Sequence, residues 1–281
     1  MLIAAAIPYA VSTAMLMRTY PLKPDHGRAG GMADRDEGKR LAKLYGCTSC
    51  HGAAFQGLRY NGDPSLVRNF APNLTLLAAR YSDTQLAQAI RQGVRPSDGR
   101  ALWGMPSATF TTITDAEMGA VLAYLRSFPA SGAPTPSDRP GIRARIAMIW
   151  GLLLPADQPN RDNTRHGTQQ PAPDLVTIAM QRPPIDPGPA YRLGRHLART
   201  ICSECHGSDL GGDSVEGGPD LIIAGAYDLP AFRRLMRTGI PPGGRDLGIM
   251  RQTAREDLHV LTDREIDALH DYLVARAAAM P

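Results

Sequence analysis

Apolar and polar positions alternate with helical spacing in two similar stretches of the chain. Each stretch holds four residues at the i, i+3, i+4, i+7 spacing of a half-buried helix. The first set is Met118, Val121, Leu122 and Leu125, and the second is Ile266, Leu269, His270 and Leu273. Thr-x-x-Glu capping boxes precede both sets, Thr114 with Glu117 and Thr262 with Glu265. In such a box the Thr oxygen and the Glu carboxylate bond free N–H groups at a helix start, so two capped amphipathic helices are predicted.

A second pattern is the uncharged, mostly apolar run over residues 2–17. Sixteen residues fall just below the roughly 17 to 25 needed to span a bilayer. The alternative is a cleavable signal segment, but no basic residue stands ahead of the run and no small-residue cleavage pattern precedes Arg18. We therefore expect residues 1–20 to form an N-terminal transmembrane helix rather than a signal segment.

Residues 129–189 have a different composition, rich in Pro, Asp, Gln and Asn. That composition is typical of an irregular, extended linker. Within it, residues 146–154 form a nine-residue apolar run that is too short to cross a membrane. Two readings of this run stay open: a single helix buried against a neighbouring domain, or a docking or membrane-surface patch.

All four cysteines belong to two copies of one pattern, Cys47-Thr48-Ser49-Cys50-His51 and Cys202-Ser203-Glu204-Cys205-His206. C-x-x-C-H is the attachment signature of haem c, in which two thiols bond the porphyrin and the His ligates the iron. A zinc site would need its cysteine pairs about 12 to 20 residues apart, and a thioredoxin-like motif gives no reason for the His. We therefore predict two covalently bound haem c groups.

The surroundings of the two motifs correspond when the motifs are superimposed. Gly38 and Gly194 begin similar helical segments, and Pro72-Asn73-Leu74 matches Pro219-Asp220-Leu221. Tyr81 to Pro96 also matches Tyr227 to Pro242 without a gap. These matches predict an all-α fold with two tandem domains, residues 34–128 and 190–277.

The sixth ligand of each iron decides between an electron carrier and a catalyst, because Met closes the iron and raises its potential. Met118 lies on an apolar helix stripe and is expected in the core, whereas Met105 precedes that helix in an irregular loop. Met250 stands one position away from the same register in the second domain. We predict that Met105 and Met250 are axial ligands, and His259 remains the alternative to Met250.

These motifs resemble the class I cytochrome c family, and specifically dihaem cytochrome subunits of membrane-bound dehydrogenases that oxidise alcohols, aldehydes or sugars. In that family the proline after the motif offers its carbonyl to the proximal His, which implies Pro72 for His51 and Pro219 for His206. Such a bond fixes the imidazole ring and its basicity. Many of these subunits carry three haems, whereas this sequence has two motifs.

The net charge of +4 does not indicate nucleic-acid binding, because four propionates on two haems would offset it. Residues 34–128 carry 11 Lys or Arg against 8 acids, which favours this half as the face for an acidic partner. We expect no catalytic residue in the chain.

The expected function is electron transfer from a dehydrogenase catalytic subunit to a quinone, cytochrome or oxidase of the respiratory chain. The expected location is the bacterial cytoplasmic membrane with the haems on the periplasmic side. A terminal oxidase subunit is the main alternative, and a dihaem peroxidase is a weaker one because the first domain has no further His after His51.

Overall fold

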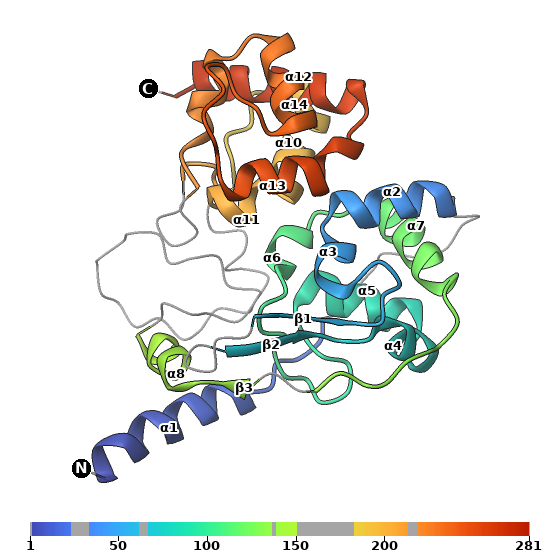
Figure 1. The fold of residues 1–281 in the computed structure, drawn as a ribbon, viewed down its shortest axis with the longest axis vertical. Coiled ribbons are helices and arrows are strands. Elements are labelled where there is room, and N and C mark those ends of the chain that lie inside the picture. Colours follow the sequence, from blue (N-terminus) through green and yellow to red (C-terminus); the bar gives the residue numbers. More distant parts are fainter. Residues whose placement is uncertain are drawn as a thin grey trace. The chain divides into compact units, whose positions relative to one another are not determined.

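The computed structural model describes residues 2–23, 34–61, 67–136, 139–150, 183–212 and 218–280. By proximity the chain forms two compact units, Met1–Gly38 with Cys50–Ala179, and Lys39–Ser49 with Met180–Pro281 (Figure 1). This division cuts through the helix that leads into the first motif. The two units have bounds other than those of the two tandem domains, residues 34–128 and 190–277, which stay a prediction.

Up to Trp150 the described part of the chain forms helices and three short strands. They are α1 Leu2–Met17, α2 Arg35–Leu44, α3 Cys47–His51, β1 Leu58–Asn61, β2 Val67–Ala71, α4 Leu74–Arg80, α5 Asp83–Gln92, α6 Ser107–Phe110, α7 Asp115–Arg126, β3 Arg139–Pro140 and α8 Ile142–Ile149. The predicted capping box of α7 is confirmed, since Thr114 Oγ1 accepts from Glu117 N and Glu117 accepts from Thr114 N. Helix α5 ends at Gly93, which adopts the left-handed region at φ 65°.

Helix α2 passes close to α7 at Gly38. A Cβ added to Gly38 would stand 1.9 Å from the carbonyl oxygen of Ala120, so only glycine allows this approach. The inner face of α7 is buried, with Met118 and Leu122 each 1% exposed. These contacts pack α7 against the start of α2, the helix that leads into the first motif.

The prediction of an all-α fold is wrong in one respect. Strands β1, β2 and β3 form a small antiparallel sheet in that order, with Leu58 paired to Ala71 and Val67 to Pro140. The strands are four, five and two residues long, which is too short for the two-residue alternation that identifies a strand from sequence.

The prediction of a membrane-spanning N-terminal helix is also wrong. Helix α1 covers the same 16 residues as the uncharged run. At 1.5 Å per residue it is about 24 Å long, against a hydrocarbon core of about 30 Å. Among the residues that the structure describes, no helix is both long enough and apolar enough to cross a bilayer.

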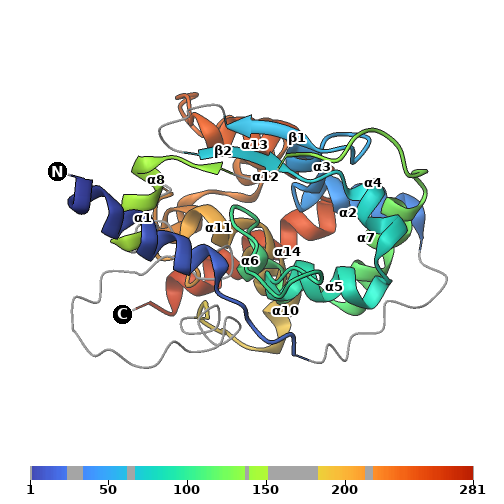
Figure 2. The ribbon, with the colours of Figure 1, turned by 90° about the horizontal axis from the view of Figure 1, so that it is seen from below.

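Part of the predicted linker has regular structure, namely β3 and α8. Helix α8 packs beside α1 in both views (Figures 1 and 2), and Arg145 links them. Its guanidinium lies 4.0 Å from the ring centre of Tyr9 and donates to Ser12 Oγ at 2.9 Å. Ala144 and Met148 are buried, whereas Ile146 and Trp150 are exposed. Only residues 146–150 of the predicted apolar run lie within the described residues.

The described residues after 183 form a helical unit. Its elements are η1 Pro189–Tyr191, α10 Arg192–Leu197, the π-helix η2 Ala198–Cys202, α11 Ser203–His206, η3 Leu221–Ala226, α12 Leu229–Thr238, α13 Ile249–Glu256, η4 Leu258–Val260 and α14 Asp263–Ala278. Helices α10 and α14 cross at Gly194, where a Cβ would stand 1.9 Å from Ala268 O. The capping box of Thr262 and Glu265 at the start of α14 is confirmed.

Candidate haem attachment sites

The first motif forms the short helix α3, which ends at a buried histidine. The Nδ1 atom of His51 lies 3.0 Å from the carbonyl oxygen of Pro72. A carbonyl oxygen can only accept, so Nδ1 carries the proton and donates it, and Nε2 of the neutral ring keeps its lone pair. Burial lowers the pKa of His51 below its usual value, which favours this neutral form. His51 therefore offers one nitrogen in the state that binds iron.

The chain after His51 closes into a tight loop that holds the ring in place. Gly57 N donates to His51 O at 2.9 Å, and Leu74 N donates to Phe55 O at 2.8 Å. Phe55 has a positive φ of 55°, unusual for a residue with a side chain. Its ring is 1% exposed and stands edge-on to that of Phe128, with centroids 5.3 Å apart. This aromatic packing compensates for the strained backbone and fixes the loop.

The second motif has the same local geometry. His206 Nδ1 lies 2.7 Å from Pro219 O, so it too donates and leaves Nε2 available. Gly212 N donates to His206 O at 2.9 Å, Leu221 N donates to Leu210 O at 3.0 Å, and Leu210 has a φ of 65°. The pKa of His206 is lowered chiefly by burial, as at the first motif.

The thiol of Cys202 in the second motif keeps its proton. Burial, followed by the neighbouring Cys205, raises the pKa of the Cys202 thiol to about 12. The thiol of Cys202 therefore stays protonated at neutral pH, and a thiol rather than a thiolate disfavours disulfide exchange. All four cysteines, which lie within the described residues, are outside disulfides.

The loop that carries Met105 contains buried donors that need an acceptor. Trp103 Nε1 and Ser107 Oγ are shielded from solvent and have no hydrogen-bond partner among the described residues. A buried donor without an acceptor lowers the free energy of unfolding by about 1–3 kcal/mol. The carboxylates of haem propionates are acceptors of the required kind, so the residues around the first motif fit the cofactor. The sequence patterns did not identify these donors.

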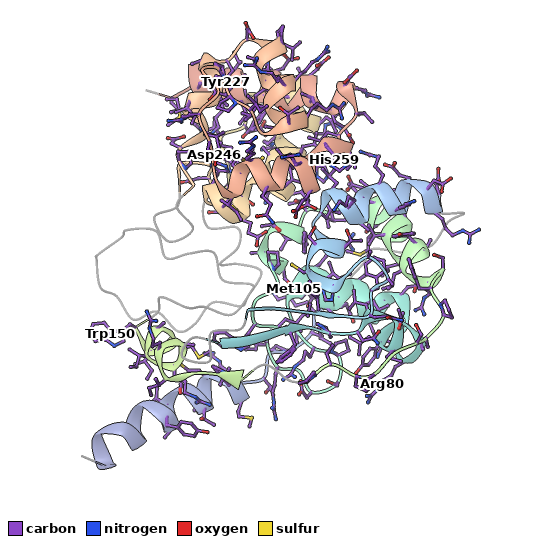
Figure 3. The ribbon with its side chains drawn as sticks, viewed as in Figure 1. Arg80, Met105, Trp150, Tyr227, Asp246 and His259 are labelled. Atoms are coloured by element: carbon purple, nitrogen blue, oxygen red, sulfur yellow. The ribbon has the colours of Figure 1, made fainter. Side chains whose placement is uncertain are left out.

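The predicted axial methionines lie in different local structures. Met105 precedes α6 in a loop that reverses at Gly104, φ 81°, and it is half-buried (Figure 3). Met250 was expected in a loop but lies in the first turn of α13, also half-buried. His259 lies in η4 with an exposed side chain, and its carbonyl accepts from Arg237. These placements leave the assignment of axial ligands as a prediction.

Comparison with known proteins finds a family match around the first motif. The cytochrome c family model matches residues 36–129, which include α3, Pro72 and the Met105 loop. Residues 36–129 are thus similar to cytochrome c, and a cytochrome c domain implies covalent haem c. The C-x-x-C-H motif of Cys47, Cys50 and His51 lies within the matched residues.

Relatives extend the similarity beyond the cytochrome c domain. The chain is 26% identical to the cytochrome c subunit of alcohol dehydrogenase (quinone) from Gluconacetobacter polyoxogenes, over 68% of this chain and 40% of that protein. It is 23% identical to the fructose dehydrogenase cytochrome subunit of Gluconobacter japonicus, over 94% of this chain and 58% of that protein. It is also 23% identical to the gluconate 2-dehydrogenase cytochrome c subunit of Pantoea cypripedii, over 86% and 59%.

These three relatives are named as cytochrome subunits and not as catalytic ones, in agreement with the expectation that this chain is no enzyme by itself. The chain spans between 40% and 59% of their lengths. The resemblance to cytochrome c subunits of dehydrogenases is thereby confirmed.

Proposed function

We propose that this chain carries two haem c groups and transfers electrons one at a time from the catalytic subunit of a dehydrogenase to the respiratory chain. The haem supplies an iron that alternates between its ferric and ferrous states. The protein residues hold that iron, set its potential and make no bond to a substrate.

The observation that carries the proposal is the repeated bond between a motif histidine and a proline carbonyl. His51 donates to Pro72 O and His206 donates to Pro219 O. Each bond fixes the tautomer in which Nε2 can ligate iron, and it orients the ring. Two sites built in the same way suit two similar electron relays rather than one relay and one catalytic haem.

Burial supports the axial assignment. Met105 and Met250 are both half-buried, whereas His259 is exposed. We assign Met105 and Met250 as the sixth ligands, because a side chain that covers the iron must itself be covered. A thioether on each iron closes it to peroxide and oxygen.

The donor and acceptor are assigned from chemistry and from the relatives. The relatives are subunits of alcohol, fructose and gluconate dehydrogenases, and the name of the first includes quinone. We assign a dehydrogenase catalytic subunit as donor and a quinone, cytochrome or oxidase as acceptor. The haem domains are placed on the periplasmic side of the bacterial cytoplasmic membrane, where bacteria attach haem to such motifs.

Isolation of the tagged chain with its native partners tests this function. A flavin or molybdenum subunit in the purified complex, together with reduction of the haems on addition of that subunit's substrate, supports the proposal. A haem–copper subunit would point to a terminal oxidase instead. Appreciable peroxide turnover by the purified chain would contradict it in favour of a peroxidase.

A further inference from the structure

Arg276 is a buried cation near the end of α14. Its side chain is 2% exposed, Nη1 donates to Asp220 Oδ1 at 3.0 Å, and Nη2 donates to Asp209 O at 3.2 Å. Removing a guanidinium from water raises the free energy of the folded state by several kcal/mol, and the bonds to its partners offset only part of this. An apolar residue at this position would stabilise the core more than the buried Arg does.

Both partners of Arg276 belong to the loops that hold His206. Asp209 lies three residues after His206, and Asp220 directly follows Pro219, whose carbonyl accepts from His206 Nδ1. Asp220 Oδ1 also accepts from Ile222 N at 2.8 Å, which starts η3. A Cβ added to Gly218 would stand 1.9 Å from Cys205 O, so this segment lies directly on the motif. One guanidinium thus joins the loop that follows His206 to the segment that follows Pro219.

The first site has the same backbone but neutral residues in these places. Asn73 follows Pro72, and its side-chain amide donates to the backbone carbonyls of Ser131 and Ala133 at 2.8 and 3.2 Å. In the register that matches Leu125 with Leu273, Arg276 corresponds to Phe128, which packs edge-on against Phe55. The first site is therefore held by an amide and an aromatic contact, and the second by an ion pair whose guanidinium is buried.

We propose that Arg276 is a positioning residue of the second haem site, which holds Pro219 against His206 and, with Asp220, sets the potential of this haem apart from the first. The proposal rests on the proposed function, since it needs a haem on His206.

The charges of the pair act in opposite directions on the iron. The Asp220 carboxylate stabilises the ferric state, which carries one more positive charge, and the Arg276 guanidinium opposes it. The Arg276 side chain is 2% exposed and that of Asp220 is 30% exposed, so solvent screens the charge of the guanidinium less than that of the carboxylate. Loss of either charge alone therefore leaves an uncompensated partner beside the haem.

The test uses the haem-loaded full chain and the midpoint potentials of its haems, read by spectroelectrochemistry. Asp220→Asn introduces the residue that the first site has at Asn73. It is expected to raise the midpoint potential of one haem by about 59 mV, which corresponds to a change of about tenfold in the ratio of reduced to oxidised iron for one electron. Arg276→Met is expected to lower the same potential by a similar factor. Arg276→Lys is expected to restore the potential but not the ferric EPR spectrum, because a single ammonium cannot bridge both partners as the guanidinium does.

The matched control is Arg233→Met, which removes the solvent-exposed ion pair between Arg233 and Asp267 in the same unit. It is expected to leave both potentials unchanged. A pyridine haemochrome count separates the two proposals: one haem per chain overturns the proposed function and this inference with it. Two haems whose potentials stay the same in Asp220→Asn overturn the inference alone, whether or not Arg276→Met folds.

Discussion

At the scale of single residues, the proposal that Met105 is the sixth ligand of the first haem iron predicts a spectral change. Met105→Ala is expected to remove part of the near-infrared absorption that arises from methionine bound to ferric haem, and to lower one midpoint potential. Absorption spectra and redox titration of the purified variant measure both effects.

Met118→Ala is the matched control, because Met118 lies on the buried face of α7 and is 1% exposed. It is expected to keep the band while the free energy of unfolding falls by about 2–5 kcal/mol. If the band were lost in Met118→Ala and kept in Met105→Ala, Met118 would be the axial ligand and the assignment of Met105 would be wrong.

Tyr272 makes the stability of the second unit dependent on alkaline pH. The side chain is fully buried, its hydroxyl donates to Ile185 O at 3.0 Å, and burial raises its pKa to about 12. The folded chain keeps a proton that the unfolded chain loses near pH 10, so this contribution is complete below about pH 10 and lost as the pH rises toward 12.

Tyr272→Phe is therefore expected to cost about 0.5–1.5 kcal/mol near neutral pH, from the lost hydrogen bond. Above about pH 10 the free energy of unfolding, measured in urea, should decrease less steeply in the variant than in the parent chain. Equal slopes in the two proteins would show that Tyr272 does not contribute.

Single residues also show how far the sequence could be interpreted. The cysteines and histidines of both motifs follow from a short pattern with a fixed chemistry, whereas Pro72 and Pro219 follow from the resemblance to the cytochrome c family. Trp103, Ser107 and Arg276 were missed because their roles depend on burial, which no local pattern encodes. A signal for Arg276 was present, since it stands one turn after Leu273 on the apolar stripe of α14.

At the scale of elements, close helix crossings are the most sensitive contacts. Gly194→Ala would place a Cβ 1.9 Å from Ala268 O and 2.5 Å from Tyr272 Cβ, and neither neighbour is a flexible side-chain end. We expect α10 and α14 to separate, at a cost of about 1–3 kcal/mol in the free energy of unfolding.

Chemical denaturation monitored by far-ultraviolet circular dichroism measures this cost. Arg264→Ala, at an exposed position on α14, is the control and should change stability by less than about 0.5 kcal/mol. A Gly194→Ala protein as stable as the parent would contradict the close approach.

Capped helices were predicted well because the capping signal is local. The residues of each pair, Thr114 with Glu117 and Thr262 with Glu265, stand three positions apart and bond as expected. The sheet was missed because β3 pairs with β2 across about 70 residues, and its two residues carry no pattern of their own. The apolar composition of α1 was recognised, but its length was overvalued as evidence of a membrane span.

At the scale of the whole molecule, the internal similarity of the sequence predicts two repeated sites, and this prediction concerns the motifs rather than the compact units. The two motifs share their loop geometry, yet the compact units are not consecutive segments, because Lys39–Ser49 group with the C-terminal unit. An alignment of the two halves of the sequence compares residues in their order along the chain. It therefore cannot show that α2 is divided between the two units.

The number of haems on the intact chain tests the central claim most directly. Mass spectrometry of the purified protein, with Cys202→Ser/Cys205→Ser as the comparison, counts covalent haems at each motif. We predict two haems in the parent chain, one in the variant, and two one-electron waves reduced to one in redox titration. A parent chain with a single haem, or a variant that keeps both, would contradict the account.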